Sequence, residues 1–177
     1  MDDETRRALA REIATVSVLR GQFTLRSGRT SSYYLDKYLF STRPEILRQL
    51  GQLFAERIPS GTHRLAGAEL GGIPLVSAAS IESGIPCIFI RNSKKEYGTS
   101  KQLEGALERG DRVVLLEDVA TTGGQALEAV EIIRSSGAEV VKTIATIDRL
   151  EGARENFEAA GVEFESIFTR EDLGVEG

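Results

Sequence analysis

The sequence predicts an α/β fold, a mostly parallel β-sheet flanked by helices, within one domain that spans residues 1–177. Short apolar runs typical of buried strands alternate with longer segments whose apolar residues recur at helical spacing. With 177 residues and 41% hydrophobic composition, the chain is also long and apolar enough to form one substantial core.

Composition argues against several classes of function. The net charge of −5 disfavours a general nucleic-acid surface, so we expect no nucleic-acid partner. Cys87 is the only cysteine; it excludes an intrachain disulfide, fits a reducing compartment and is expected to be a buried, inert thiol. His63, the only histidine, lies in a polar stretch that favours a solvated loop, which weakens the case for Ser-His-Asp chemistry or a histidine-based zinc site. No apolar run follows the acidic N-terminus, so we expect a cytoplasmic protein without a signal peptide or membrane span.

The first elements along the chain are predicted to be a helix and a β-hairpin. Asp2 or Asp3 is expected to cap the helix, which ends near Gly21. Its buried face consists of Leu9, Ile13 and Val16. Residues 23–36 have strand-like ends around a basic, hydroxyl-rich turn, which predicts the hairpin. That turn is either a solvated connection or a lid over a planar anionic ligand, and both interpretations stay open.

A helix–strand–helix segment is predicted next. Pro44 suits the first position of a helix, and residues 65–68 form a short apolar strand. After Glu69, the pair Gly71-Gly72 leads into another helix that runs through Ser83. The two glycines permit either a close approach of backbone amides to a diphosphate or a plain strand-to-helix turn.

A long basic connection separates the next two strands. Residues 88–90 form a buried strand, and the following one begins near Arg112, so residues 91–111 lie between them. Connections of this length in compact domains are usually functional or mobile. This connection holds Arg91, Lys94, Lys95, Tyr97, Gly98 and Lys101. One interpretation is a solvated, charged surface loop. Beside a phosphate site, a lid that closes on a polyanion fits this segment better.

The most informative stretch is residues 113–125, V-V-L-L-E-D-V-A-T-T-G-G-Q. Its aliphatic run predicts a strand buried on both faces, directly followed by Glu117 and Asp118. A loop of hydroxyls and glycines then leads into a helix near Gln125, whose amides and dipole suit a phosphate. The acids suit ribose hydroxyls or a hydrated cation. The chain has neither a G-x-x-x-x-G-K-[ST] nor a G-x-G-x-x-G motif, so this stretch predicts a phosphorylated-sugar site of another kind.

The remaining elements continue the alternation. We expect a helix over 126–136, a strand over 140–147 that ends in Asp148-Arg149, a helix over 152–160, a strand over 164–168 and a loose polar tail over 172–177. Ligands of such sheets bind beyond the carboxyl ends of the strands. Glu69, Arg91, the two acids and Arg149 all follow predicted strands, so the topology is expected to bring them together.

Residues 113–125 resemble the motif with which type I phosphoribosyltransferases bind 5-phosphoribosyl 1-diphosphate (PRPP). Over nearly its whole length the chain resembles the orotate phosphoribosyltransferases. The further similarity lies in F-T-L-R-S-G-R-T-S-S-Y-Y at 23–34, in the basic loop at 91–99 and in Asp148-Arg149.

The resemblance implies transfer of a phosphoribosyl group from PRPP to N1 of orotate, with Mg²⁺ carried mainly by the diphosphate and ribose of PRPP rather than by protein ligands. It implies a hood over orotate at residues 1–40 and a catalytic loop at 91–111 that completes the neighbouring subunit's site in a homodimer. The implied catalytic residues are Asp118, Glu117, Lys95 and Arg91. The implied PRPP-binding residues are Arg91, Asn92, Lys95, Tyr97, Glu117, Asp118, Val119, Ala120, Thr121, Thr122, Gly123, Gly124 and Gln125. The implied orotate-binding residues are Thr121, Arg149, Arg26 and Tyr34.

Four positions depart from the family pattern. Asn92 stands where a lysine is usual, Tyr97 where histidine is usual, and Gly71 where many members carry a lysine. Arg26 replaces a lysine but keeps its charge. Two of these changes remove a positive charge, and the third removes a side chain that can become positively charged. Together they predict weaker PRPP binding with activity retained. The alternatives are a phosphoribosyltransferase for another base and a PRPP-sensing regulator without catalysis.

Overall fold

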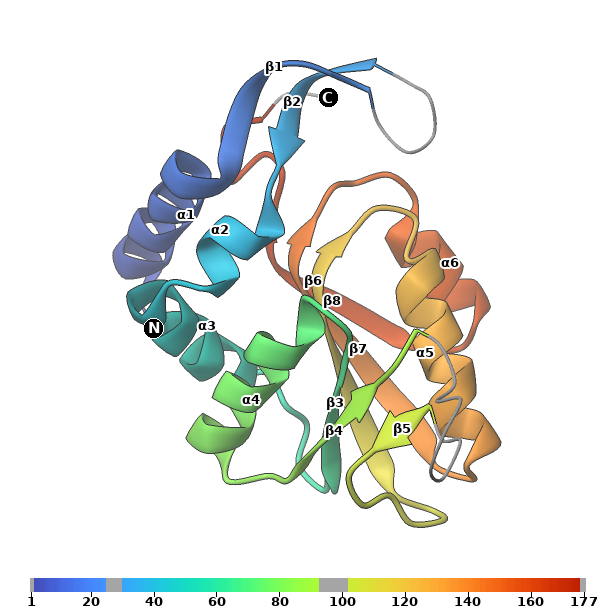
Figure 1. Cartoon of the computed structure of the whole chain (residues 1–177). Helices are drawn as coiled ribbons and strands as arrows, with labels where there is room; N and C mark the ends of the chain where they lie inside the picture. Colours follow the sequence, from blue (N-terminus) through green and yellow to red (C-terminus); the bar gives the residue numbers. More distant parts are fainter. Residues whose placement is uncertain (1, 25–29, 93–101, 176–177) are drawn as a thin grey trace.

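The structure, a computed structural model, describes residues 2–24, 30–92 and 102–175. In this part of the chain a six-stranded sheet has the order β5-β4-β3-β6-β7-β8, and a separate two-stranded hairpin lies beyond one end of it (Figure 1). The large sheet consists of β3 (Arg64–Ala68), β4 (Cys87–Ile90), β5 (Leu103–Glu104), β6 (Arg112–Ala120), β7 (Glu139–Asp148) and β8 (Glu163–Thr169). All pairings are parallel except that of β4 with β5, which confirms the predicted mostly parallel sheet.

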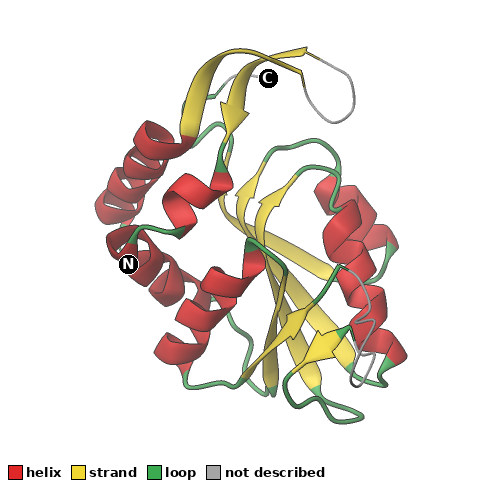
Figure 2. Ribbon diagram, viewed as in Figure 1, coloured by secondary structure: helices red, strands yellow, loops and turns green. Residues whose placement is uncertain are grey.

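Helices cover both faces of this sheet (Figure 2). On one face lie α3 (Pro44–Ala55) and α4 (Gly72–Ser83), and on the other α5 (Gly124–Ser135) and α6 (Ala153–Ala159). Two apolar cores result, one on each side of the sheet. The aliphatic run at the start of β6 is fully buried because its side chains enter both cores in alternation.

The N-terminal part forms a layer outside α3 and carries the hairpin. It contains α1 (Asp3–Ser17), β1 (Val18–Thr24), β2 (Thr30–Leu35) and α2 (Lys37–Ser41). Asp2 caps α1 by accepting a hydrogen bond from the Thr5 N–H at 2.8 Å, as expected. The helix ends at Ser17, earlier than the predicted Gly21, because the backbone from Val18 onward pairs with β2 instead of continuing the helix.

Two further expectations require correction. The polar tail was predicted to be loose, but it is packed up to Val175. Leu173 and Val175 are 6% and 5% exposed and pack against the core. Its turn is held by Asp172, whose carboxylate accepts from the Thr169 N–H at 2.8 Å. Cys87 is only half-buried, because β4 lies next to the short strand β5 near the edge of the sheet. His63 is solvated as expected, with a side chain 49% exposed.

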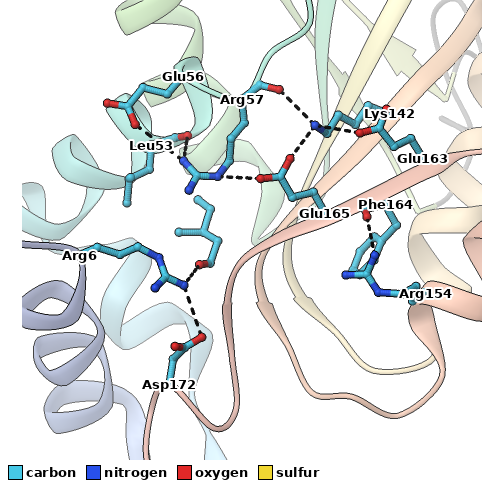
Figure 3. Close-up of polar contacts among 11 residues, drawn as sticks. Arg6, Leu53, Glu56, Arg57, Lys142, Arg154, Glu163, Phe164, Glu165 and Asp172 are labelled. Atoms are coloured by element: carbon cyan, nitrogen blue, oxygen red, sulfur yellow. Dashed lines mark hydrogen bonds and ion pairs between the residues drawn. The ribbon is translucent and has the colours of Figure 1, made fainter. Parts of the chain in front are cut away.

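A charged network ties the N-terminal ends of β7 and β8 to the end of α3 (Figure 3). Lys142 in β7 is 9% exposed and forms ion pairs with Glu165 at 2.6 Å and Glu163 at 3.1 Å. Glu165 also pairs with Arg57, which follows α3, at 3.0 Å. Because parallel strands share one direction, this network lies at the sheet edge opposite to the carboxyl ends of the strands.

No helix among the described residues combines the length and apolar character that a membrane crossing requires.

Candidate active site

The carboxyl ends of β3, β4, β6 and β7 lie along one edge of the sheet, on the side of the hairpin in Figure 1. The connections that follow these strands carry most of the candidate residues inferred from the sequence. Two backbone hydrogen bonds join neighbouring strand ends: the Glu69 N–H donates to the Ile90 carbonyl at 2.8 Å, and the Arg149 N–H to the Ala120 carbonyl at 2.9 Å. The topology therefore gathers Glu69, Arg91 and Arg149 around the end of β6, as predicted.

Glu117 and Asp118 lie within β6, which continues to Ala120 rather than ending before the acids. The strand is longer than predicted because Glu117, Val119 and Ala120 keep pairing with β7. Asp118 is 1% exposed, and one of its carboxylate oxygens, Oδ1, accepts from the N–H of Val119 at 2.6 Å. The two acids are therefore held by regular backbone structure, which limits the movement of their carboxylates.

Lys37, the first residue of α2, pairs with the other oxygen of the same carboxylate. Its Nζ lies 2.8 Å from Asp118 Oδ2, and its side chain is 32% exposed against 2% for Asp118. The helix is positioned by Asp36, whose side chain accepts from the Tyr38 N–H at 3.1 Å. Neither α2 nor Lys37 was predicted from the sequence, because a helix this short shows too few turns for its apolar spacing to be recognised. The available signal was Asp36 as a capping residue.

Burial and mutual repulsion set the electrostatics of the acid pair. Burial, followed by the negative charge of Asp118, raises the pKa of Glu117 to about 8 from its ordinary 4.5, and Lys37 offsets part of that rise. Burial by itself disfavours the charged form of Lys37, but the charge and hydrogen bond of Asp118, with the charge of Glu117, outweigh it and raise the pKa of Lys37. Near neutral pH the cluster thus combines a cation, its partner carboxylate and a carboxyl group able to donate or accept a hydrogen bond.

The loop from Thr121 to Gly124 leads directly into α5, which begins one residue before the predicted Gln125. Gly123 adopts a left-handed φ of 77°, and a Cβ there would come within 2.8 Å of the Phe157 ring, so position 123 requires glycine. The Asn156 side chain donates to the Thr122 carbonyl at 2.8 Å and holds the loop from outside. Thr122, Gly124 and Gln125 are exposed. The first N–H groups of the helix are therefore oriented toward a surface that a phosphate can reach.

Arg149, just beyond β7, faces the hairpin. Its guanidinium donates to the Tyr33 hydroxyl at 3.0 Å, lies 5.2 Å from the centre of the Tyr33 ring and pairs with Glu151 at 3.0 Å. The side chain is 14% exposed, and its Nε is buried without a hydrogen-bond partner in the described part of the chain. An arginine with an unused donor in a confined site is suited to a planar carboxylate.

The structure distinguishes the two tyrosines of β2. Tyr33 is 7% exposed and contacts Arg149, whereas Tyr34 is 46% exposed and packs against Phe23, with ring centres 5.7 Å apart. Tyr34 was the residue predicted for the orotate pocket, and that role stays a prediction. Tyr33 was not singled out, although the two-residue period of the strand places exactly one of two adjacent side chains on the inner face.

At the end of β4 the side chains of Asn92 and Gln125 come together. The Asn92 N–H donates to Glu69 Oε1 at 2.6 Å, and Gln125 Nε2 lies 3.5 Å from Asn92 Oδ1. The Nε of Arg91 is buried and has no hydrogen-bond partner within residues 2–24, 30–92 and 102–175. Of the other predicted residues, Arg26, Lys94, Lys95 and Tyr97 lie outside the described residues.

The described residues contain no cluster of three or more histidine, cysteine, aspartate or glutamate side chains able to hold a metal ion. Mg²⁺ is commonly bound by one or two carboxylates together with substrate phosphates and water. Glu117 and Asp118 fit that mode, in which the substrate provides most of the ligands.

Comparison with known proteins agrees with this geometry. Residues 41–166 match the sequence model of the phosphoribosyl transferase domain. The chain is 49% identical to the orotate phosphoribosyltransferase of Natronomonas pharaonis, covering 86% of this chain and 87% of that protein. It is 45% identical to that of Methanocella arvoryzae, with coverage of 90% and 91%.

Solved structures show the same similarity. The crystal structure of Mycobacterium tuberculosis orotate phosphoribosyltransferase in complex with PRPP superimposes with a TM-score of 0.81 at 32% identity, covering 96% of this chain and 99% of that one. The enzyme from Aeropyrum pernix gives a TM-score of 0.83 at 32% identity, with coverage of 93% and 95%. The fold, the residues at the strand ends and the similarity to these relatives lead to one conclusion. The chain belongs to the orotate phosphoribosyltransferase family of type I phosphoribosyltransferases.

Proposed function

We propose that the chain transfers the 5-phosphoribosyl group of PRPP to N1 of orotate, giving orotidine 5′-monophosphate and diphosphate for pyrimidine nucleotide synthesis. The observation that carries this proposal is the contact between the two halves of the site. The acid pair lies in β6 and the Thr121–Gly124 loop follows it. Arg149 follows β7 and contacts Tyr33 of β2, while its N–H donates to the carbonyl of Ala120, the last residue of β6. A phosphoribosyl site and a carboxylate site are thus adjacent.

In the PRPP half, the backbone amides of residues 119–125 and the hydroxyls of Thr121 and Thr122 hold the 5′-phosphate at the N-terminus of α5. Glu117 and Asp118 hold the ribose hydroxyls. The raised pKa of Glu117 gives it a proton to donate to a ribose oxygen near neutral pH, while Asp118 accepts. Gln125 and Asn92, which approach each other in the structure, line the same edge.

In the orotate half, Arg149 pairs with the carboxylate of orotate through its fork of donors. Tyr33 holds the guanidinium plane from the hairpin side. Thr121 would contact the same base; its neighbour Ala120 accepts the hydrogen bond from the Arg149 N–H, which supports this assignment. Arg26 and Tyr34 complete this half from the hood formed by residues 1–40.

The reaction needs charge placement more than proton transfer. The bond between C1 of the ribose and the diphosphate oxygen breaks, the electron pair leaves with the diphosphate, and N1 of orotate forms the new bond to C1. The sugar passes through a state with oxocarbenium character, which the carboxylate of Asp118 stabilises. Orotate arrives as an anion, so no strong base is required, and the absence of a histidine from the described site does not impede the step.

Mg²⁺ is proposed to be carried mainly by the diphosphate and ribose oxygens of PRPP, where it neutralises charge on the leaving group. Arg91, Lys95 and Tyr97 would close over the diphosphate, within a catalytic loop at residues 91–111. Leu103 and Glu104 of that segment form β5, so its C-terminal part is anchored to β4. Closure removes water and strengthens these contacts.

The chain is proposed to act as a cytoplasmic homodimer in which the loop of one subunit completes the site of the other. Leu70, two residues before α4, is 63% exposed, and Ile81 within α4 is 82% exposed. Large apolar side chains this exposed on one helix and its N-terminal turn are typical of a surface that pairs with another subunit.

Comparing acceptors tests the proposal against its nearest alternative. With PRPP and Mg²⁺, orotate should be consumed, while hypoxanthine, adenine and uracil should give less than about one hundredth of that kcat/KM, because a neutral base leaves Arg149 unpaired. Faster turnover with a neutral base would indicate a different phosphoribosyltransferase. PRPP binding without turnover of any of these bases would instead support a PRPP-sensing regulator.

A further inference from the structure

Lys37 is a charged residue of the site for which neither the sequence motifs nor the proposed mechanism provides a role. It comes from α2, outside the motif at residues 113–125, and its ammonium contacts the acid pair proposed to bind ribose. Its long side chain is more than half withdrawn from solvent, with its ammonium 2.8 Å from Asp118 Oδ2. A lysine held over a buried carboxylate at a strand end is either a structural counter-ion or a ligand-binding group.

The backbone next to the ion pair shows where in the site Lys37 lies. A methyl group built on Gly71 would overlap Asp118 Oδ2, the same oxygen that pairs with Lys37. Lys37, Asp118 and the Gly71 backbone therefore meet at one point between the ends of β3 and β6. Because Gly71 has no side chain, position 71 contributes only backbone at this point.

The order of the strands then indicates which part of PRPP would lie near Lys37. Arg149 follows β7, on one side of β6, and Lys37 sits toward β3, on the other side. If orotate occupies the β7 side of the ribose, the departing diphosphate occupies the side of β3 and β4. Arg91 follows β4 on that side and carries a buried Nε that has no partner among the described residues. Lys37, which lies toward β3, and Arg91, which follows β4, are therefore on the same side of β6.

We propose that Lys37 binds the diphosphate of PRPP: its ammonium pairs with Asp118 in the free protein and moves to the diphosphate oxygens when Asp118 takes up a ribose hydroxyl. The inference rests on the proposed function, because it takes the ribose and orotate positions from it. The exchange keeps both charges paired in each state, since Asp118 gains a hydroxyl donor as it loses the ammonium. Lys37 thereby supplies positive charge at a place where Gly71 and Asn92 supply none.

A double-mutant cycle separates direct binding from mere orientation of Asp118. The four proteins are the wild type, Lys37→Met, Asp118→Asn and the double variant, and the double variant is expected to fold because no buried charge is left unpaired. Binding of magnesium diphosphate and of ribose 5-phosphate is measured by calorimetry, which requires no turnover. Lys142→Met controls for the loss of a buried, doubly paired lysine remote from the site.

Within the Asp118→Asn background, Lys37→Met should weaken magnesium diphosphate binding roughly tenfold or more, the effect of one charge-assisted contact, and change ribose 5-phosphate binding less than about twofold. Lys37→Arg should retain most of the diphosphate affinity, and Lys142→Met all of it. Unchanged diphosphate affinity in that background, or equal losses for both ligands, would overturn the proposal. Wild-type protein that binds diphosphate but does not consume orotate would instead refute the proposed function.

Discussion

The guanidinium of Arg149 donates a hydrogen bond to the hydroxyl of Tyr33 at 3.0 Å and stacks near its ring, linking residues 116 positions apart. This contact joins the N-terminal hairpin to the sheet edge that carries the acid pair. It places a positively charged, partly unsatisfied side chain beside the proposed ribose site. We propose that this contact holds Arg149 in position for a substrate with a carboxylate.

Replacing Arg149 with alanine should raise the KM for orotate roughly 10- to 100-fold, the range for losing hydrogen bonds to a charged group. The KM for PRPP should change less than about threefold, because the acids lie in β6 and the loop before α5 follows β6, whereas Arg149 follows β7. Steady-state kinetics with each substrate varied in turn measures both values. Equal increases for the two substrates would contradict the proposed carboxylate contact.

Tyr33→Phe should raise the orotate KM by a smaller factor, about three- to tenfold, since Arg149 loses one neutral acceptor but keeps its pairing with Glu151. Tyr34→Phe is the matched control in the same strand, because the Tyr34 side chain is exposed and packs on Phe23. The structure predicts the larger effect for Tyr33. A larger effect for Tyr34 would support the role that the sequence pattern gave it and indicate that the hood rearranges on binding.

Asp118→Asn should lower kcat by roughly 10²–10³, the scale for removing one electrostatic contact made mainly in the transition state. Asp111→Asn is a control at the opposite end of β6, where Asp111 is 9% exposed and pairs with Arg64. That variant should lose stability and keep kcat. A normal kcat for Asp118→Asn would exclude Asp118 from the mechanism.

Glu117→Gln should stabilise the fold, and increasingly so as pH rises. Between pH 4.5 and about 8 the unfolded chain has lost the Glu117 proton while the folded protein retains it, so the free energy of unfolding falls through this window and levels off above it. Glutamine cannot ionise and avoids this loss. Melting curves should show a gain of roughly 5–10 °C at pH 8.5 and little at pH 4.5.

Glu158→Gln, on the exposed part of α6, controls for the general loss of one negative charge. Its melting temperature should stay within about 1 °C of the wild type at both pH values, as for most surface substitutions. If Glu117→Gln gained as much at pH 4.5 as at pH 8.5, the raised pKa of Glu117 could not be the cause.

Most of the fold followed from the sequence because its strands are short aliphatic runs bounded by glycines. The run before Glu117 and the apolar segment before Arg91 are buried strands of one parallel sheet, as predicted. Element ends were less predictable, since they depend on pairing partners. Ser17 ends α1 because Val18 pairs with Leu35, a contact that local spacing does not reveal.

Site residues that are contiguous in sequence were predictable. Site residues that only the tertiary structure brings together were not. The acid pair and the glycine loop are contiguous in sequence, so their residue types were sufficient. Lys37 and Tyr33 reach the site through the tertiary placement of α2 and β2. Lys37 has no neighbour in sequence that indicates a ligand, and only the folded arrangement distinguishes Tyr33 from the adjacent Tyr34.

The most direct test of the account is a steady-state assay that follows orotate loss in the presence of PRPP and Mg²⁺, with the products identified by mass. The account predicts that orotate is consumed in equal amounts with PRPP, that orotidine 5′-monophosphate and diphosphate appear, and that removing Mg²⁺ with a chelator abolishes the reaction. Undetectable orotate loss at saturating PRPP and Mg²⁺, with folded protein, would contradict it.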